Sequence, residues 1–212
     1  MLKLVKKGDP SWFKRAADTL LPGVKVPAIH LSTSLDHYGM QVIKGIPLCT
    51  NTHTAALGTL LGQLTEWEEN HPVESWPWHQ YLDALEHRCH LLRVMKWLRE
   101  QDVPCGHFCH GDLTLENVLI DRNYHLWLID PNTRLGFNSV HVDRGKLMFS
   151  MSYHERFGSY WLTREMHERL MQIHWSVADR ACLLTHIIRL NGHRNQWHID
   201  AWLREEFERC VS

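Results

Sequence analysis

Three oxygen-bearing side chains in the middle of the chain have a spacing that suits phosphoryl transfer. Asp112 and Asn117 precede an apolar run at 118–120, and Asp130 ends the next apolar run, which begins at Leu126. Carboxylate and amide oxygens are the ligands that Mg²⁺ prefers, and a further carboxylate can orient a hydroxyl group and take its proton. We therefore expect Asn117 and Asp130 to hold Mg²⁺ and Asp112 to activate an attacking hydroxyl.

The segment around these residues resembles the protein-kinase-like superfamily, and within it the aminoglycoside and choline type of phosphotransferase. Residues 110–117, HGDLTLEN, are similar to the catalytic loop of that group, and residues 130–132, DPN, stand in the place of its metal motif. Residues 142–147, VDRGKL, resemble an Asp-x-x-Lys-Leu stretch of bacterial phosphotransferases often associated with surface-carbohydrate genes. The resemblance spans about residues 38–190 and is specific over 107–147.

The resemblance implies an α+β fold of the bilobal, protein-kinase-like kind. A minimal N-lobe would comprise residues 1–48 and a mainly helical C-lobe residues 49–212. Backbone groups of Gln41, Val42 and Ile43, in the hinge between the lobes, would hold the adenine of ATP. ATP and Mg²⁺ are therefore the expected cofactors.

The resemblance also gives two residues a supporting role. The ring of His110 would brace the backbone around Asp112, and Asp143 would support the catalytic loop from behind. Thr114 stands where Ser/Thr protein kinases carry a lysine, which favours a small-molecule phosphotransferase.

A lysine of the first strand would contact the α/β-phosphates. Lys6 shares a face with Leu4 in an alternating strand, whereas Lys7 points to the other face, and we favour Lys6. No glycine precedes Lys6, so we expect the Gly-rich hairpin that usually covers the phosphates to be missing. Asp18 is the only acid between residues 10 and 21 that could pair with the lysine.

The hydrophobic pattern predicts the elements that must position these residues. Residues 1–48 have the pattern of a small α+β unit, and the remainder is mainly helical apart from a hairpin that carries the polar motifs. The predicted strands are 2–7, 26–31, 38–43, 118–120 and 126–129, and the predicted helices are 10–21, 57–67, one long helix over 81–98, helical structure from 142 to a stop at 191–192, and 197–207.

The expected function is ATP-dependent transfer of a phosphoryl group to a hydroxyl of a small molecule or carbohydrate. Two alternatives stay open: a minimal atypical protein kinase of the bacterial effector or phage type, and a nucleotide-binding pseudokinase that acts as a regulatory module. The acceptor is not evident from the sequence.

The composition limits the partners. The 212 residues include 23 Lys and Arg against 24 Asp and Glu, a net charge of −1, so no overall basic field favours nucleic acid or an anionic membrane. No run of 18 apolar residues and no signal-peptide pattern is present, and the six scattered cysteines suit reduced thiols. We expect a cytoplasmic protein without a membrane span, and the oligomeric state stays open.

Other chemically suggestive residues have simpler interpretations. Cys105, His107, Cys109 and His110 lack the spacing of a zinc site, so we do not expect one. Helical spacing predicts core positions for Trp67 and Trp97, whereas Trp76 and Trp78 flank a proline and could contact substrate. The basic residues Arg134, Arg144 and Lys146 are interpreted as solvated or structural charges rather than a substrate-phosphate site.

Overall fold

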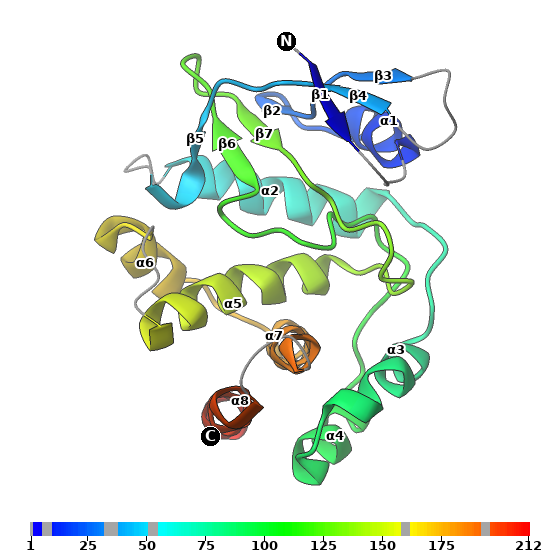
Figure 1. Ribbon diagram of the computed structural model, residues 1–212, viewed down its shortest axis with the longest axis vertical. Helices are drawn as coiled ribbons and strands as arrows, with labels where there is room; N and C mark the ends of the chain where they lie inside the picture. Colours follow the sequence, from blue (N-terminus) through cyan, green and yellow to red (C-terminus); the bar gives the residue numbers. More distant parts are fainter. Residues whose placement is uncertain (1, 6–9, 32–37, 51–54, 158–161, 192–195) are drawn as a thin grey trace.

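Two small sheets and a set of helices make up the part of the molecule that the structure describes. The computed structural model describes residues 2–5, 10–31, 38–50, 55–157, 162–191 and 196–212. Figure 1 shows the sheets at one end, α2 and α5 crossing the middle, and α3, α4, α7 and α8 beyond them. The mixed α+β architecture predicted from the sequence is confirmed.

The first sheet belongs entirely to the N-terminal segment. It has the strand order β1-β4-β3, with β1 (Leu2–Val5) and β3 (Ile29–Leu31) both antiparallel to β4 (Tyr38–Gln41). The helix α1 (Ser11–Ala17) follows β1 and buries Trp12, Phe13 and Ala16. The predicted strands 2–7, 26–31 and 38–43 each contain one of these shorter strands.

Helix α1 ends earlier than the pattern predicts. The prediction extends to residue 21, whereas the helix ends at Ala17. The buried amide of Gln63, on α2 (Ala55–Asn70), accepts a hydrogen bond from the backbone N–H of Leu21 and donates one to the carbonyl of Thr19. These bonds satisfy backbone groups that would otherwise continue the helix, so a tertiary contact sets its end.

The second sheet joins the N-terminal segment to the central hairpin. Its order is β2-β7-β6-β5, from β2 (Val24–Lys25), β7 (Leu126–Leu128), β6 (Val118–Ile120) and β5 (Ile46–Pro47). Strand β2 is parallel to β7, and β6 and β7 form the predicted antiparallel hairpin. At the hairpin turn, Oδ1 of Asp121 accepts the backbone N–H groups of Asn123 and His125. Residues 1–48 therefore contribute strands to both sheets.

The helix that follows the hairpin packs closely against its neighbour. Helix α5 (Val140–Phe157) crosses α7 (Val177–Leu190) at Gly145, where an added Cβ would lie 2.7 Å from the Cβ of Cys182. A glycine inside a helix is unfavourable by itself, and this contact explains its presence. Helix α5 also carries Asp143, whose carboxylate accepts the backbone N–H groups of His110 and Gly111, next to Asp112.

The prediction of one long helix over 81–98 is wrong. The structure has α3 (Trp78–Leu85), a 3₁₀ turn at Glu86–Arg88 and a separate α4 (Leu92–Arg99). The side chain of Asn191, at the end of α7, donates a hydrogen bond of 2.7 Å to the carbonyl of Arg88. This contact satisfies a carbonyl at the break, and local periodicity cannot indicate it.

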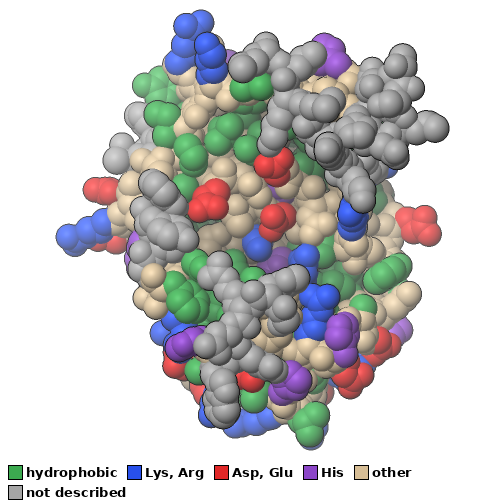
Figure 2. Space-filling view, in the orientation of Figure 1, with side chains coloured by type: hydrophobic (Ala, Val, Ile, Leu, Met, Phe, Trp, Pro, Cys, Tyr) green, Lys and Arg blue, Asp and Glu red, His purple; other side chains and the backbone are tan. Residues whose placement is uncertain are grey.

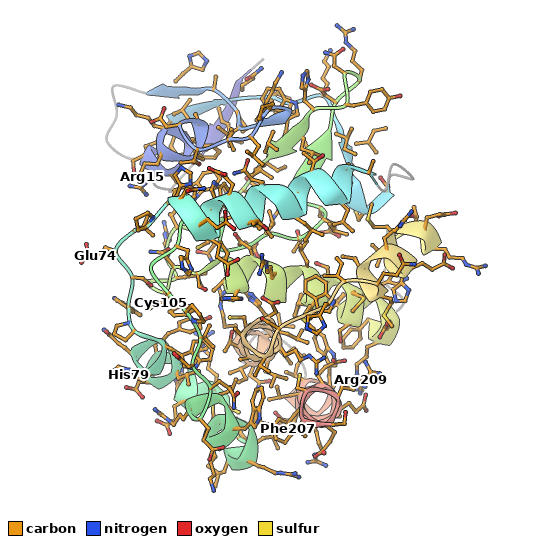
Figure 3. The ribbon with its side chains drawn as sticks, turned by 180° about the vertical axis from the view of Figure 1, so that it is seen from behind. Arg15, Glu74, His79, Cys105, Phe207 and Arg209 are labelled. Atoms are coloured by element: carbon orange, nitrogen blue, oxygen red, sulfur yellow. The ribbon has the colours of Figure 1, made fainter. Side chains whose placement is uncertain are left out.

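The last helices close the C-terminal half. Helix α6 (Arg164–Met171) begins at the cap Thr163, and α8 (Gln196–Val211) packs Phe207 against Trp97 of α4, with ring centres 5.9 Å apart (Figure 3). None of the helices in the described part of the chain is both long enough and apolar enough to cross a bilayer.

Candidate active site

A tight turn at Gly111 presents Asp112 at the surface. Gly111 has a φ of 78°, and an added Cβ would collide with the carbonyl oxygen of Asn132. The N–H of Asn132 in turn donates to the carbonyl of His110, at 2.9 Å. The left-handed conformation and the close approach both require glycine, so the chain reverses immediately before the carboxylate.

Asp143 holds the backbone of this turn. Its carboxylate is completely buried and accepts the N–H of His110 at 2.7 Å and the N–H of Gly111 at 2.8 Å, one on each oxygen. Burial raises the pKa of Asp143 to about 7, and the two backbone donors act in the opposite direction. The side chain touches the loop from the α5 side, away from the surface that carries Asp112.

His110 connects the turn to the hairpin. Its ring is 1 % exposed, and Nε2 lies 2.8 Å from the carbonyl oxygen of Ile129. Burial lowers the pKa of His110 to about 4, so the ring is neutral at pH 7 and Nε2 donates to this carbonyl. Trp12 packs edge-on against the ring and donates its indole N–H to the carbonyl of Cys109, so α1 packs against the same turn.

Asn117 and Asp130 reach the site through the pairing of β6 and β7. The carbonyl of Asn117 accepts the N–H of Ile129 at 3.0 Å, so Asp130 follows directly after the residue paired with Asn117. The Asn117 amide nitrogen donates to the carbonyl of Asp112 at 2.8 Å and lies 3.4 Å from its Oδ2. This orientation leaves the amide oxygen of Asn117 available to a ligand.

Asp130 has the other features of a cation ligand. It has a φ of 53°, which is uncommon for a residue other than glycine, and its side chain is exposed. Among the described residues its carboxylate has no hydrogen bond or ion pair. A carboxylate oxygen from Asp130 and an amide oxygen from Asn117 are ligand types that fit Mg²⁺.

Solved structures share this arrangement of elements. An ethanolamine kinase from Plasmodium vivax matches 99 % of this chain and 75 % of its own length, with 10 % identity and a TM-score of 0.53. A choline kinase from Streptococcus pneumoniae matches 98 % of this chain and 83 % of its own length, with 12 % identity and a TM-score of 0.57. An ADP-bound aminoglycoside phosphotransferase matches 97 % of this chain and 91 % of its own length, with 13 % identity and a TM-score of 0.54.

The chain has the protein-kinase-like fold. The sequence-based expectation of this fold, in its choline and aminoglycoside kinase form, is thereby confirmed. At 10–13 % identity the likeness concerns the fold alone. Neither a protein-family model nor the sequence of a curated protein matches the chain.

One side chain that lies against Asp112 is not expected there from the sequence. The sequence predicts a solvated or structural charge at Lys146, and in the structure its Nζ lies 3.0 Å from Oδ1 of Asp112. Asp143 and Lys146 are three residues apart on α5 and therefore lie on one face of the helix. The three-residue spacing could have predicted this contact, because a helix that brings Asp143 to the loop also brings Lys146, on the same face, towards it.

The residues expected to contact the phosphates and the adenine of ATP remain a prediction. Lys6 and Lys7 lie outside the described residues. Gln41 uses its backbone N–H within the first sheet, in a 2.9 Å bond to the carbonyl of Ala28. Val42 lies beyond the strand and is 39 % exposed. Of the three predicted adenine contacts, Val42 and Ile43 thus lie in the extended connection that follows β4, and Gln41 is the last residue of that strand.

The remaining candidates behave as ordinary structural residues. No group of three or more potential metal ligands occurs within the described ranges, and Cys105 is exposed at the edge seen in Figure 3. Trp78 is buried, which contradicts the idea that it contacts substrate, because it begins α3 and donates its indole N–H to the carbonyl of Leu98. Arg144 forms an ion pair with Glu68 at 3.0 Å.

Proposed function

We propose that the protein is an ATP-dependent phosphotransferase that moves the γ-phosphoryl group of ATP to a hydroxyl of a small molecule or carbohydrate. The observation that supports this most is that Asn117 bonds to Asp112 through its side chain and, through its backbone, to the residue before Asp130, next to a turn held by the buried Asp143. The kinases that share the fold act on ethanolamine, choline and aminoglycosides, according to their names.

Asp112 acts on the acceptor in this proposal. Its side chain is 38 % exposed, so a hydroxyl can reach it, and its two oxygens face Lys146 and Asn117. The carboxylate orients the hydroxyl and receives its proton while the new O–P bond forms and the bond between the γ-phosphorus and ADP breaks. The contacts from both sides hold the carboxylate before the acceptor arrives, which reduces the entropy lost in reaching the reactive geometry.

Asn117 and Asp130 hold Mg²⁺ in this proposal. When bound, the ion neutralises negative charge on the transferring phosphoryl group. His110 and Asp143 keep the backbone between these residues in place, and neither contacts the substrate. The nucleotide lies towards the connection that contains Val42 and Ile43, and one kinase with the same fold was solved with ADP bound.

The test measures both turnover and the destination of the phosphate. The purified protein is incubated with Mg²⁺, γ-labelled ATP and a cell extract that contains both metabolites and proteins, and ADP and labelled products are quantified against the extract alone. Asp112→Asn and Asp130→Asn are expected to lower turnover by at least about 100-fold, because each removes a charge used in the transition state. Glu116→Gln is the matched control, since it removes an exposed acid from the same loop and is expected to retain activity.

The outcomes separate the three functions. Label in small molecules, lost in both aspartate variants, supports the proposal. Label confined to protein bands other than that of the enzyme itself identifies a protein kinase instead, and nucleotide binding without turnover across the extract identifies a pseudokinase. Turnover that survives Asp112→Asn refutes the role given to Asp112.

A further inference from the structure

The ammonium group of Lys146 lies between a carboxylate and an aromatic ring. Its Nζ is 3.0 Å from Oδ1 of Asp112 and 4.4 Å from the centre of the Phe149 ring. The Lys146 side chain is 15 % exposed. Burial lowers the pKa of Lys146, and the neighbouring Asp112 acts in the opposite direction.

These two contacts are the ones that recognise an alkylammonium ion. A carboxylate supplies a charge-assisted hydrogen bond or ion pair, and the face of an aromatic ring attracts the cation. In this protein, the carboxylate of Asp112 and the ring of Phe149 already contact the ammonium of Lys146. Lys146 therefore occupies the place in which a cationic acceptor would bind beside Asp112.

The ammonium of Lys146 lies close enough to Asp112 to affect how tightly a charged acceptor binds. A reacting hydroxyl must come within hydrogen-bond distance of Asp112. In a small amino alcohol the nitrogen is two carbons from the hydroxyl oxygen, or within about 4 Å. Its charge would then lie a few Å from Nζ of Lys146, where repulsion between two like charges weakens binding by roughly 10- to 100-fold.

A second basic residue adds to the same field. Arg189, near the end of α7, lies close enough to Lys146 to lower the lysine pKa further. Figure 2 shows acidic side chains grouped at the centre of this face and basic side chains directly below them. Lys146 of α5 and Arg189 of α7 thus bring two basic groups near each other on this side of the site, and the acids Asp112 and Glu116 act in the opposite direction on the pKa of Lys146.

We propose that Lys146 excludes acceptors with a positive charge beside the reacting hydroxyl and selects a neutral or acidic polyol or sugar. This inference rests on the proposed phosphotransferase function and specifies its acceptor. It separates the chain from kinases for amino alcohols, although the fold is the same.

The first experiment compares pairs of acceptors that differ in one group. Glycerol is paired with 2-amino-1,3-propanediol, and glucose and glucuronate with glucosamine, and kcat/KM is measured for each with ATP and Mg²⁺. The wild type is expected to favour the neutral or acidic member by at least about 10-fold. Lys146→Ala is expected to lose that preference and Lys146→Arg to keep it, with Lys96→Ala, an exposed lysine of α4, as matched control. A wild type that prefers the amines, or an unchanged ratio in Lys146→Ala, overturns the inference.

The second experiment does not depend on turnover. Binding of choline is measured by calorimetry for the wild type and for Lys146→Ala, with Lys146→Ser as a second variant should the alanine protein not fold. We expect the variant to bind choline about 10- to 100-fold more tightly, because the carboxylate and the ring become free, and Asp112→Asn in the same variant to abolish the gain. Equal affinity in wild type and variant, or no binding to either, overturns the inference. If the wild type transfers phosphate to no acceptor, the proposed function fails, and this binding comparison still decides the role of Lys146.

Discussion

Asp143 offers the sharpest test of how the turn before Asp112 is held. The substitution Asp143→Asn keeps one acceptor oxygen and turns an NH₂ group towards the other backbone N–H. One of the N–H groups of His110 and Gly111, now bonded at 2.7 and 2.8 Å, is left without an acceptor in a completely buried position. A buried donor without a partner costs about 1–3 kcal/mol, and the new NH₂ group adds a similar amount. Removal of the buried charge offsets part of this cost, because burial raises the pKa of Asp143 to about 7, so we expect a net loss of about 1–3 kcal/mol.

The measurement is the free energy of unfolding in urea together with kcat on the folded protein. Asp179→Asn is the matched control, because Asp179 is also a buried carboxylate with two partners, the N–H of Ser176 and the ring of His141. Both variants are expected to lose stability, and Asp179→Asn at least as much as Asp143→Asn, because the effect of burial on the pKa of Asp179 is outweighed by hydrogen bonds from His141 and Ser176, which lower it. Only Asp143→Asn is expected to lower kcat, by about 10- to 100-fold, since it alone releases the turn that positions Asp112.

Two results would refute this reasoning. One is an Asp143→Asn protein within about 0.5 kcal/mol of the wild type, which would mean that the two backbone donors do not depend on the carboxylate. The other is an equal loss of kcat in both variants, which would show that general destabilisation, and not the position of the turn, limits activity.

Three further predictions concern neighbouring groups. Gly111→Ala is expected to lower the unfolding free energy by at least about 2 kcal/mol, because it combines a positive φ with a clash against the carbonyl of Asn132; a urea titration within 0.5 kcal/mol of the wild type would contradict it. The folded-state pKa of His110, about 4, is below its unfolded value of about 6.5, so the folded protein binds fewer protons and loses stability as the pH falls from 7 to 4. Relative to His110→Asn, this loss is expected to reach about 3 kcal/mol in unfolding measured across that range, and parallel pH curves would exclude it. Gln63→Leu leaves two backbone groups beside α2 without partners and is expected to cost about 2–4 kcal/mol in thermal or urea unfolding, whereas Thr65→Val on the exposed face of the same helix is expected to change little.

Much of the candidate site could be predicted because its signals are local. Asp112 and Asn117 lie in one loop, and the apolar runs on either side of residues 121–123 predict the hairpin that brings Asp130 back to them. Turn chemistry and alternation act over a few residues, so a single sequence shows them directly. The same is true of the α+β division of the fold.

Other features depend on contacts between distant residues. The end of α1 is set by Gln63, and the break between α3 and α4 is accompanied by a bond from Asn191, and neither contact is visible in the local pattern. Trp12 packs against His110, nearly one hundred residues away, so the first helix helps to support the turn before Asp112. Tertiary hydrogen bonds of this kind override the weak preferences that single residues have for helix.

The sequence by itself determined which groups could carry out phosphoryl transfer, because their types and spacing are matters of covalent order. Only the tertiary structure decided what surrounds them. Lys146 looks like one more surface charge in the sequence, yet the close packing of α5 at Gly145 and the bonds from Asp143 to the loop bring its ammonium to Asp112. Charges interact through the distance between them in space, and that distance is set by the packing of helices and not by their order in the chain.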